Sequence, residues 1–443
     1  MWSQYLRTRE RNGIVAIFHE LYPDPVYCTL RQWKELADGI TGGIQMLIDD
    51  FRLRKLLVNS PKDDCLEFAK VAAVLESKLN QTTILYLMAA QGCNINCRYC
   101  PVPETAQRHG AVILSKEDAF LGINLWQEHL KETYNPDLQY FVIFYGGEPL
   151  LNRETIEASL CYMKMKKEKG ALPPGINLMI ATNGILIDNE MVALCKKYGM
   201  NVAVGLDGPK TVNDALKIDN NGDGTFDRIV AAIRLLVANG IRTFASVSIT
   251  PYNVHQISGY SEFFRELGVE KFGFNFLKGR RLLELVGHNG LQNYYRQAAQ
   301  GIIKNAQLTG KPGFEYQMEK KQNAFDRMDF YPVDCTCYGN QLVIQPDGQV
   351  SNCPFFKSQI GYVRNVGKNF RIWNQPIVKA WRKRLPLYHH NEAKALSGGG
   401  CAWSTYELKG DPLAADESSE IFAEEVLNEL IWSKYDRLTS QKT

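Results

Sequence analysis

The sequence lacks long apolar runs and an excess of charge of either sign. No segment approaches the roughly eighteen apolar residues that a membrane-spanning helix needs. The 51 Lys and Arg residues against 48 Asp and Glu leave a net charge of only +3, which does not indicate a nucleic-acid partner. The N-terminal residues also lack the apolar core of a secretory signal. We therefore expect a cytoplasmic protein that binds neither membranes nor nucleic acid.

Cysteine, in contrast, is frequent, with 11 among 443 residues, and without an export signal this favours metal ligation over disulfides. Cys93, Cys97 and Cys100 have the spacing C-x3-C-x2-C and follow an apolar segment that predicts a buried strand. One short loop with this spacing can provide three ligands of a cubane iron–sulfur cluster. Because such clusters usually take four cysteines, one iron would stay open to a substrate or cofactor. A structural zinc site is the alternative.

This loop closely resembles the radical S-adenosylmethionine (SAM) superfamily. The resemblance implies a [4Fe–4S] cluster on the three cysteines, with SAM at its open iron. Reduction of that cluster would cleave SAM to a 5′-deoxyadenosyl radical, which can take hydrogen from an unactivated C–H bond. The family's GGE motif holds the methionyl amino group, and an asparagine contacts the ribose. With a tyrosine of the cysteine loop, the matching positions are the predicted cofactor-binding residues: Gly146, Gly147, Glu148, Asn183 and Tyr99.

Two further features bear on this resemblance. Many relatives carry an arginine for the SAM carboxylate at the end of the fifth strand, where this sequence has Ser246, so the recognition of that carboxylate is not predicted. Residues 206–209 and 220–227 are similar to a pattern of peptide- and protein-modifying members. The second segment could equally be a turn before a capped helix. The sequence singles out no catalytic acid or base.

Residues 83–277 alternate short apolar segments with helical patterns, which is typical of parallel βα units. Six such units fall short of the eight that close a TIM-type barrel. We therefore expect an α/β fold with a partial (β/α)6 barrel, which the resemblance also implies, and chemistry at the carboxyl ends of its strands. The predicted strands are 84–90, 141–145, 177–182, 201–206, 242–250 and 271–277, and the predicted helices are 118–134, 153–169, 189–198 and 226–239.

Four more cysteines follow the predicted barrel: Cys335, Cys337, Cys353 and Cys401. Between them, residues 342–350 predict a β-hairpin with a Pro-Asp-Gly turn. Their order resembles the inner half of the SPASM domain of peptide and protein maturases, which implies that the four bind one auxiliary [4Fe–4S] cluster. Where the outer cluster would take cysteines, the sequence has Tyr388, Asn391 and Ser397, and no cysteine follows Cys401. We therefore expect a reduced, twitch-like domain with a single auxiliary cluster, or zinc as the alternative.

Three domains are expected, over residues 1–80, 81–280 and 281–443. The first is a small α+β element with a hairpin turning at residues 23–25 and helices near 32–36 and 63–78. It is similar to the winged-helix-like elements with which peptide maturases capture a leader peptide as an added strand, but a flap packed on the barrel is the favoured interpretation. The last domain ends in an amphipathic helix over 417–438.

These features predict a radical SAM oxidoreductase that modifies a ribosomally synthesised precursor peptide by crosslinking, thioether formation, epimerisation or backbone excision. The expected cofactors are two [4Fe–4S] clusters and SAM. The expected partners are the precursor peptide, an electron donor such as flavodoxin or ferredoxin, and, as a further candidate, a separate leader-recognition protein. A sulfatase-activating maturase, a small-molecule radical SAM enzyme and a degenerate peptide-binding iron–sulfur protein are the alternatives.

Overall fold

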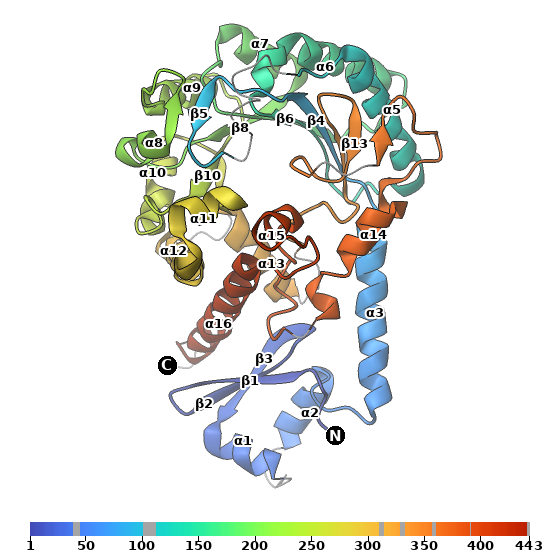
Figure 1. The fold of residues 1–443 in the computed structure, drawn as a ribbon. Helices are drawn as coiled ribbons and strands as arrows, with labels where there is room; N and C mark the ends of the chain where they lie inside the picture. Colours follow the sequence, from blue (N-terminus) through green and yellow to red (C-terminus); the bar gives the residue numbers. More distant parts are fainter. Residues whose placement is uncertain are drawn as a thin grey trace.

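The computed structural model describes residues 1–38, 45–100, 112–309, 314–327, 333–356, 360–389 and 391–440. Figure 1 shows a curved sheet with helices on its outer side, an N-terminal element at the opposite end, and C-terminal segments between the two. No helix among these residues is both long and apolar enough to cross a membrane.

Six parallel strands form the barrel, and they are the six that the sequence predicts, to within one residue at each end. Their order in the sheet follows their order in the chain, as consecutive βα units require. The α/β fold class with an incomplete barrel is thereby confirmed. The strands are β4 (Ile84–Ala90), β6 (Tyr140–Gly146), β7 (Ile176–Thr182), β8 (Met200–Gly205), β10 (Thr243–Ile249) and β11 (Lys271–Phe276).

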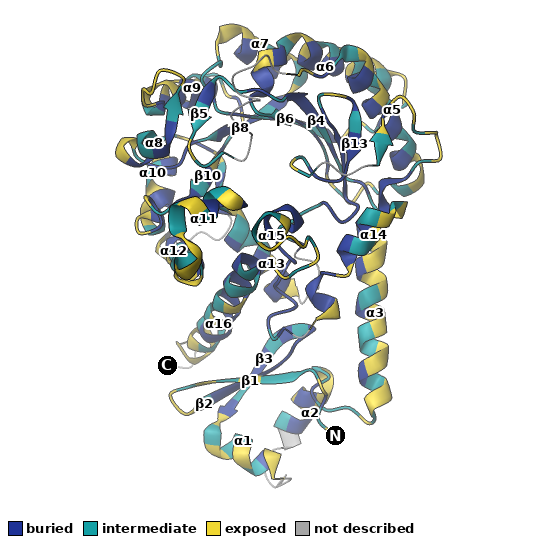
Figure 2. Cartoon of the chain, viewed as in Figure 1, coloured by how far each residue is buried: buried dark blue, intermediate teal, exposed yellow. Residues whose placement is uncertain are grey.

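Helices cover the outer face of this sheet, as Figure 1 shows. The side chain of Ser115 accepts a hydrogen bond from the N–H of Asp118 and caps the first of them, and Asp188 caps the third through Met191. Their inner faces and the strands are buried while the outer faces are exposed (Figure 2). The four predicted helices are α5 (Lys116–Thr133), α6 (Arg153–Glu168), α7 (Asn189–Tyr198) and α9 (Phe226–Ala238).

The sheet does not end with the barrel strands. The predicted hairpin forms as β12 (Gln341–Ile344) and β13 (Gln349–Ser351), with β14 (Gly361–Tyr362) beside it. β12 pairs in parallel with β4, so the sheet has nine strands and runs across the boundary expected near residue 280. All four residues of β12 are buried, as is usual for parallel strands. The sequence indicates the hairpin through its turn but not its distant partner.

The N-terminal element is a three-stranded antiparallel sheet of β1 (Leu6–Arg11), β2 (Ile14–His19) and β3 (Tyr22–Thr29). The prediction of a turn at residues 23–25 was wrong: the chain reverses at residues 20–21, and both prolines lie inside β3. An edge strand tolerates proline because its outward amides need no partner. β1 was not predicted, although Asn12 and Gly13, both with positive φ, form the Asn-Gly turn typical of a hairpin.

Helices α1 (Leu30–Ala37), α2 (Gln45–Leu53) and α3 (Pro61–Leu79) complete this element. It packs on α16 (Glu417–Ser440), the predicted C-terminal helix, and on α13 (Tyr316–Arg327). The Arg11 guanidinium lies 4.5 Å from the ring centre of Trp432 on α16. α16 in turn packs on α12 (Leu291–Thr309), beside the barrel. The remaining helices are α8 (Lys210–Leu216), α10 (Tyr260–Glu266), α11 (Arg280–Val286), α14 (Pro376–Arg382) and α15 (Ala402–Lys409).

Candidate active site

The loop of Cys93, Cys97 and Cys100 follows the carboxyl end of β4, where the chemistry of barrel folds lies. Its middle forms β5 (Ile95–Cys97), which pairs antiparallel with β9 (Lys217–Asp219), so that Cys97 lies opposite Lys217. The three thiols are half-buried and free of disulfides. Burial raises the pKa of Cys93 to about 11, and the nearby Cys100 thiol adds to the shift. The pairing with β9 therefore anchors the cysteine loop.

Gly146 and Gly147 allow the end of β6 to lie directly against this loop. The N–H of Gly147 donates to the carbonyl of Ala90 at 2.9 Å, and that of Glu148 donates to the carbonyl of Gly92 at 2.9 Å. A Cβ on Gly147 would lie 2.3 Å from the Gly92 oxygen, and one on Gly146, with φ of +144°, 2.2 Å from the Ala90 oxygen. Any side chain at either position would push the loop away.

Glu148 is fully buried and ties two strand ends together. One oxygen accepts hydrogen bonds from the Leu150 N–H at 3.0 Å and the Thr182 hydroxyl at 2.7 Å, and the other from the Asn183 N–H at 2.8 Å. Burial raises its pKa to about 6. Asn183 reaches the cysteine loop: its Nδ2 lies 2.7 Å from the Asn94 side-chain oxygen and 3.6 Å from the Cys93 sulfur. The structure thus brings these predicted residues together.

Tyr99 points to the end of β8, where its hydroxyl donates to the Asp207 carboxylate. Lys217 approaches the same carboxylate at 3.5 Å and donates to the Gly205 carbonyl at 2.9 Å, with both charged side chains buried. The Ser248 N–H also donates to Asp207, at 2.9 Å. The sequence did not single out Lys217 as a site residue. Its only signal, a cation opposite a cysteine, becomes visible once β5 and β9 are paired.

Ser246, at the position where many relatives would have an arginine, is exposed in the middle of β10. Its hydroxyl oxygen accepts a hydrogen bond from Asn275 of β11 at 3.0 Å. Polar groups rather than a cation therefore occupy this position.

The four C-terminal cysteines come from three separate segments. Cys335 and Cys337 precede β12, Cys353 follows β13, and Cys401 is the N-cap of α15. A hydrogen bond from Cys337 lowers the pKa of Cys335 to about 7, while burial, with the neighbouring Cys401 and Cys335 thiols, raises that of Cys353. Among the residues that the structure describes, no three His, Cys, Asp or Glu side chains are gathered as a single metal ion would need.

The three positions that the resemblance assigns to outer-cluster cysteines have ordinary contacts. Tyr388 is 46% exposed and packs edge-on against Phe68 of α3. Asn391 accepts a hydrogen bond from the Ala393 N–H at 2.8 Å, and the Ser397 hydroxyl lies 3.5 Å from that of Ser419. Polar turn residues and helix α3 of the N-terminal element thus occupy the side of the domain where the outer-cluster cysteines would lie.

A cavity of about 580 Å³ lies between the carboxyl ends of β4 and β6 and the C-terminal region. One wall is the mouth of the barrel, with Met88, Ala90, Gly146 and Gly147, and the other is the C-terminal region. Phe355 and Trp403 stand on that second wall with ring centres 5.3 Å apart. The further lining residues are Gln91, Val112, Gln345, Pro346, Asp347, Gln349, Pro354 and Glu407. Since it contains predicted cofactor residues, this cavity is the candidate active site.

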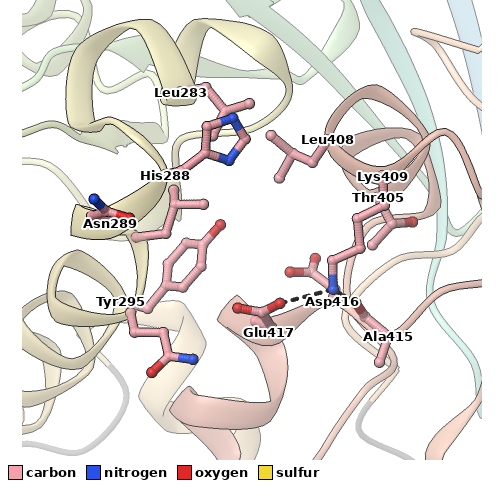
Figure 3. A pocket seen from close by; sticks show the side chains of 12 residues that line it. Leu283, His288, Asn289, Tyr295, Thr405, Leu408, Lys409, Ala415, Asp416 and Glu417 are labelled. Atoms are coloured by element: carbon pink, nitrogen blue, oxygen red, sulfur yellow. Dashed lines mark hydrogen bonds and ion pairs between the residues drawn. The ribbon is translucent and has the colours of Figure 1, made fainter.

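A second cavity, of about 400 Å³, lies between α11, α12, α15 and the start of α16. Figure 3 shows Tyr295 with its hydroxyl directed into this space and the 2.9 Å ion pair of Lys409 and Glu417 at its side. It contains none of the predicted site residues. Its lining residue Asp416 connects it to the C-terminal cysteines, because it accepts the N–H of Cys401 at 2.7 Å.

Comparison with known families supports this assignment of the barrel. Residues 88–263 match the family model described as the Radical SAM superfamily. These residues, which include the cysteine loop and most of the barrel strands, are therefore assigned as a radical SAM domain.

Among curated proteins, the chain is similar to a radical SAM cyclopropyl synthase, TigE, of Paramaledivibacter caminithermalis, at 27% identity over 65% of this chain and 60% of that protein. It is 22% identical to the subtilosin biosynthesis protein AlbA of Bacillus subtilis over 70% and 64% of the two chains. A cysteine-type anaerobic sulfatase-maturating enzyme of Clostridium novyi is 25% identical over 66% and 82%. The chain thus spans less than two thirds of the first two relatives.

Two solved structures share the fold. Native anSMEcpe with bound AdoMet and Cp18Cys peptide aligns with a TM-score of 0.63 and 18% identity, over 81% of this chain and 99% of that one. Streptococcus suis SuiB bound to S-adenosylmethionine aligns with a TM-score of 0.50 and 14% identity, over 95% and 99%. At these identities the likeness concerns the fold.

Proposed function

We propose that the protein is a cytoplasmic radical SAM enzyme that modifies a precursor peptide. The observation that carries this proposal is the 580 Å³ cavity, because it has the GGE glycines on one wall and the auxiliary cysteine region on the other. A substrate held there would lie between the source of a radical and a second redox centre. The name of AlbA, a biosynthesis protein of the bacteriocin subtilosin, supports a peptide as the substrate.

The residues of the first site fit a cluster with SAM. Cys93, Cys97 and Cys100 are thiol donors on one loop, and the side-chain-free surface of Gly146 and Gly147 leaves the cavity wall open to a ligand. When bound, the cluster and SAM would supply a 5′-deoxyadenosyl radical. The proposed function requires no other chemistry from the cluster and SAM.

The chain's own residues would orient the cofactor and exclude water. Glu148 holds the backbone of Asn183 in place while the Asn183 side chain braces the cysteine loop. Tyr99, Asp207 and Lys217 form a buried network under the same loop, which limits its movement. Pre-organisation of this kind lets a reactive centre be aimed at one atom of the substrate.

The C-terminal region would hold a single auxiliary [4Fe–4S] cluster on Cys335, Cys337, Cys353 and Cys401, so that the protein carries two clusters. Four thiols are the donor set that such clusters take, and zinc would be the competing metal. With every iron ligated by protein, this cluster suits electron transfer better than substrate binding.

The N-terminal sheet is the candidate for binding the leader of the precursor peptide. β3 carries two prolines and contacts α16 and α13, whereas β1 pairs with β2 on one side alone. An added strand would therefore pair with the edge of β1. A flavodoxin or ferredoxin would supply electrons, and a separate leader-recognition protein is a further candidate partner.

The decisive experiment measures two products from one anaerobic reaction of reconstituted enzyme, SAM, a chemical reductant and the peptide encoded by the short reading frame nearest the gene. We expect release of 5′-deoxyadenosine together with a mass change of the peptide. Loss of two hydrogens would identify a crosslink, a larger loss excision, and deuterium uptake alone epimerisation. Absence of 5′-deoxyadenosine from a cluster-replete sample would exclude the proposed radical SAM activity.

A second candidate is maturation of a folded protein of the sulfatase type. The likeness to the sulfatase-maturating enzyme, which covers 82% of that protein, favours it. A cysteine-containing sulfatase peptide in the same assay separates the candidates, because only a maturase of this type would convert it. The cysteine pattern opposes this function, since sulfatase-type relatives are expected to keep the three cysteines replaced here by Tyr388, Asn391 and Ser397.

A further inference from the structure

Four cationic side chains surround the C-terminal cysteines. Lys321 is fully buried and Arg384 is 4% exposed, whereas Lys278 and Lys320 are half-buried. Buried cations are rare because desolvation of an ammonium or guanidinium is costly unless negative charge compensates it. Four cations around one group of thiols, two of them buried, therefore indicate that the site carries substantial negative charge.

Each cation contacts a residue within two positions of a cysteine, or the carboxylate that accepts a cysteine's backbone N–H. Lys278 lies 3.2 Å from Asp416, whose carboxylate accepts the Cys401 N–H at 2.7 Å. Arg384 donates to the hydroxyl of Tyr338, the residue after Cys337, at 2.9 Å.

The two cations on α13 reach the other side of the site. Lys321 lies 2.8 Å from the carboxylate of Asp334, the residue before Cys335. Lys320 donates to the Val333 carbonyl, two residues before Cys335.

The charges do not cancel. Lys278, Lys320, Lys321 and Arg384 contribute four positive charges, and Asp334 and Asp416 contribute two negative ones, so this shell carries 4 − 2 = +2. A fully thiolate-ligated [4Fe–4S] cluster is a dianion when oxidised and a trianion when reduced. The shell balances the oxidised form and attracts the reduced form more strongly.

Backbone amides act in the same direction. The Ser404 N–H lies 3.4 Å from the Cys401 sulfur at the start of α15, and the amides of Phe355 and Phe356 donate to the Cys353 thiol. Hydrogen bonds to cysteine sulfur are among the factors that set cluster potentials. At the first site, by contrast, Lys217 is matched by Asp207, which leaves no net charge in that pair.

We propose that Lys278 and Arg384, with the lysines of α13, raise the reduction potential of the auxiliary cluster above that of the SAM-binding cluster. The proposal rests on the proposed function, because it concerns a cluster at the C-terminal cysteines. On reduction the cluster gains one electron and no proton, and the fixed cations compensate the added charge. Lys278 and Arg384 act on the cluster through their positive charges. They are positioning residues and contact no substrate.

The test uses full-length chain in which Cys93, Cys97 and Cys100 are replaced by alanine, so that only the auxiliary cluster is observed. After anaerobic reconstitution with iron and sulfide, iron is counted and the midpoint potential is measured by titration with dithionite under EPR. In this background Lys278→Met should shift the potential to more negative values, and Lys278→Arg should restore it. Lys167→Met is the matched control, since Lys167 is a half-buried lysine on α6 that donates to the Ile176 carbonyl.

A second variant tests the sign of the effect. Asp416→Asn keeps the acceptor for the Cys401 N–H but removes a negative charge, so its potential should shift to less negative values. Unchanged potentials in both variants, with full iron content, would overturn the inference and leave the proposed cluster intact. A site without iron, or filled with zinc, would overturn the auxiliary cluster itself and the inference with it.

Discussion

The two cysteine sites are built in opposite ways. The first takes its three thiols from one loop of eight residues, braced by the ends of neighbouring strands, and the buried Lys217–Asp207 ion pair beside it carries no net charge. The second collects four thiols from three segments that span 67 positions, from Cys335 to Cys401, and is surrounded by excess positive charge. A local loop suits a site that must stay open to a ligand, whereas two of the four thiols at the site built from distant segments are buried. The first site is therefore suited to chemistry and the second to holding charge.

Removal of the first site should have the largest effect. Replacing Cys93, Cys97 and Cys100 by alanine removes every thiol of the loop, so release of 5′-deoxyadenosine should fall to background while about four irons per chain remain at the second site. Iron analysis and chromatography of the nucleoside measure both. Cys161→Ala, at an exposed cysteine on α6, should change neither; release that survives the triple replacement would show that the loop does not make the radical.

Removal of the second site should separate radical formation from product formation. Cys401→Ala takes away one auxiliary ligand and the cap of α15, so we expect loss of the auxiliary irons and of peptide product. 5′-Deoxyadenosine should still form, because the first loop is untouched. Full product yield from a protein that lacks these irons would mean that the two sites do not cooperate.

Adding a single methyl group at Gly147 should show how closely the first site depends on its tight backbone contact. Gly147→Ala places a Cβ 2.3 Å from the Gly92 oxygen, which forces the cysteine loop away at a cost of about 1–3 kcal/mol. SAM binding, measured by calorimetry on reconstituted protein, should weaken markedly while the auxiliary irons stay. Gly175→Ala, where a Cβ meets open space, is the control, and equal SAM affinity in both variants would contradict the tight contact.

The smallest expected effect is on the pH dependence of stability and concerns Glu315, which joins the barrel to α13. Its carboxylate accepts hydrogen bonds from the N–H groups of Phe274, Gln317 and Met318 at 2.7–3.0 Å. Burial raises its pKa from 4.5 to about 7. The folded state thus holds a proton that the unfolded state has lost between these values, so stability should fall as pH rises from about 4.5 to about 7, by at most about 3 kcal/mol.

Glu315→Gln should remove this part of the pH dependence. Urea unfolding of the two proteins between about pH 5 and about pH 8 measures it, and Glu319→Gln, on the same helix, is the control. A stability difference between wild type and Glu315→Gln that does not change with pH would contradict the raised pKa.

Local patterns carried most of the barrel prediction. The six strands were placed correctly because each is a short apolar segment bounded by turn residues, and a βα repeat needs no distant partner to be recognised. The same reasoning failed at the N-terminus, where two prolines were taken for a turn although they lie in an edge strand. Lys278 and Arg384 carried no local signal at all, since a cation's partners are decided by packing.

The sequence by itself determined the fold class, the presence of a radical SAM domain and the order of the cysteines, because strand periodicity, glycine pairs and ligand spacing are written in consecutive residues. The tertiary structure decided which other residues these features contact. It placed β12 beside β4 across 257 positions, from Ile84 to Gln341, and so brought Cys335, Cys337 and Cys353 to the barrel's edge. It also assembled the +2 shell around them, because pairing and burial act between residues that are neighbours only once the chain has folded.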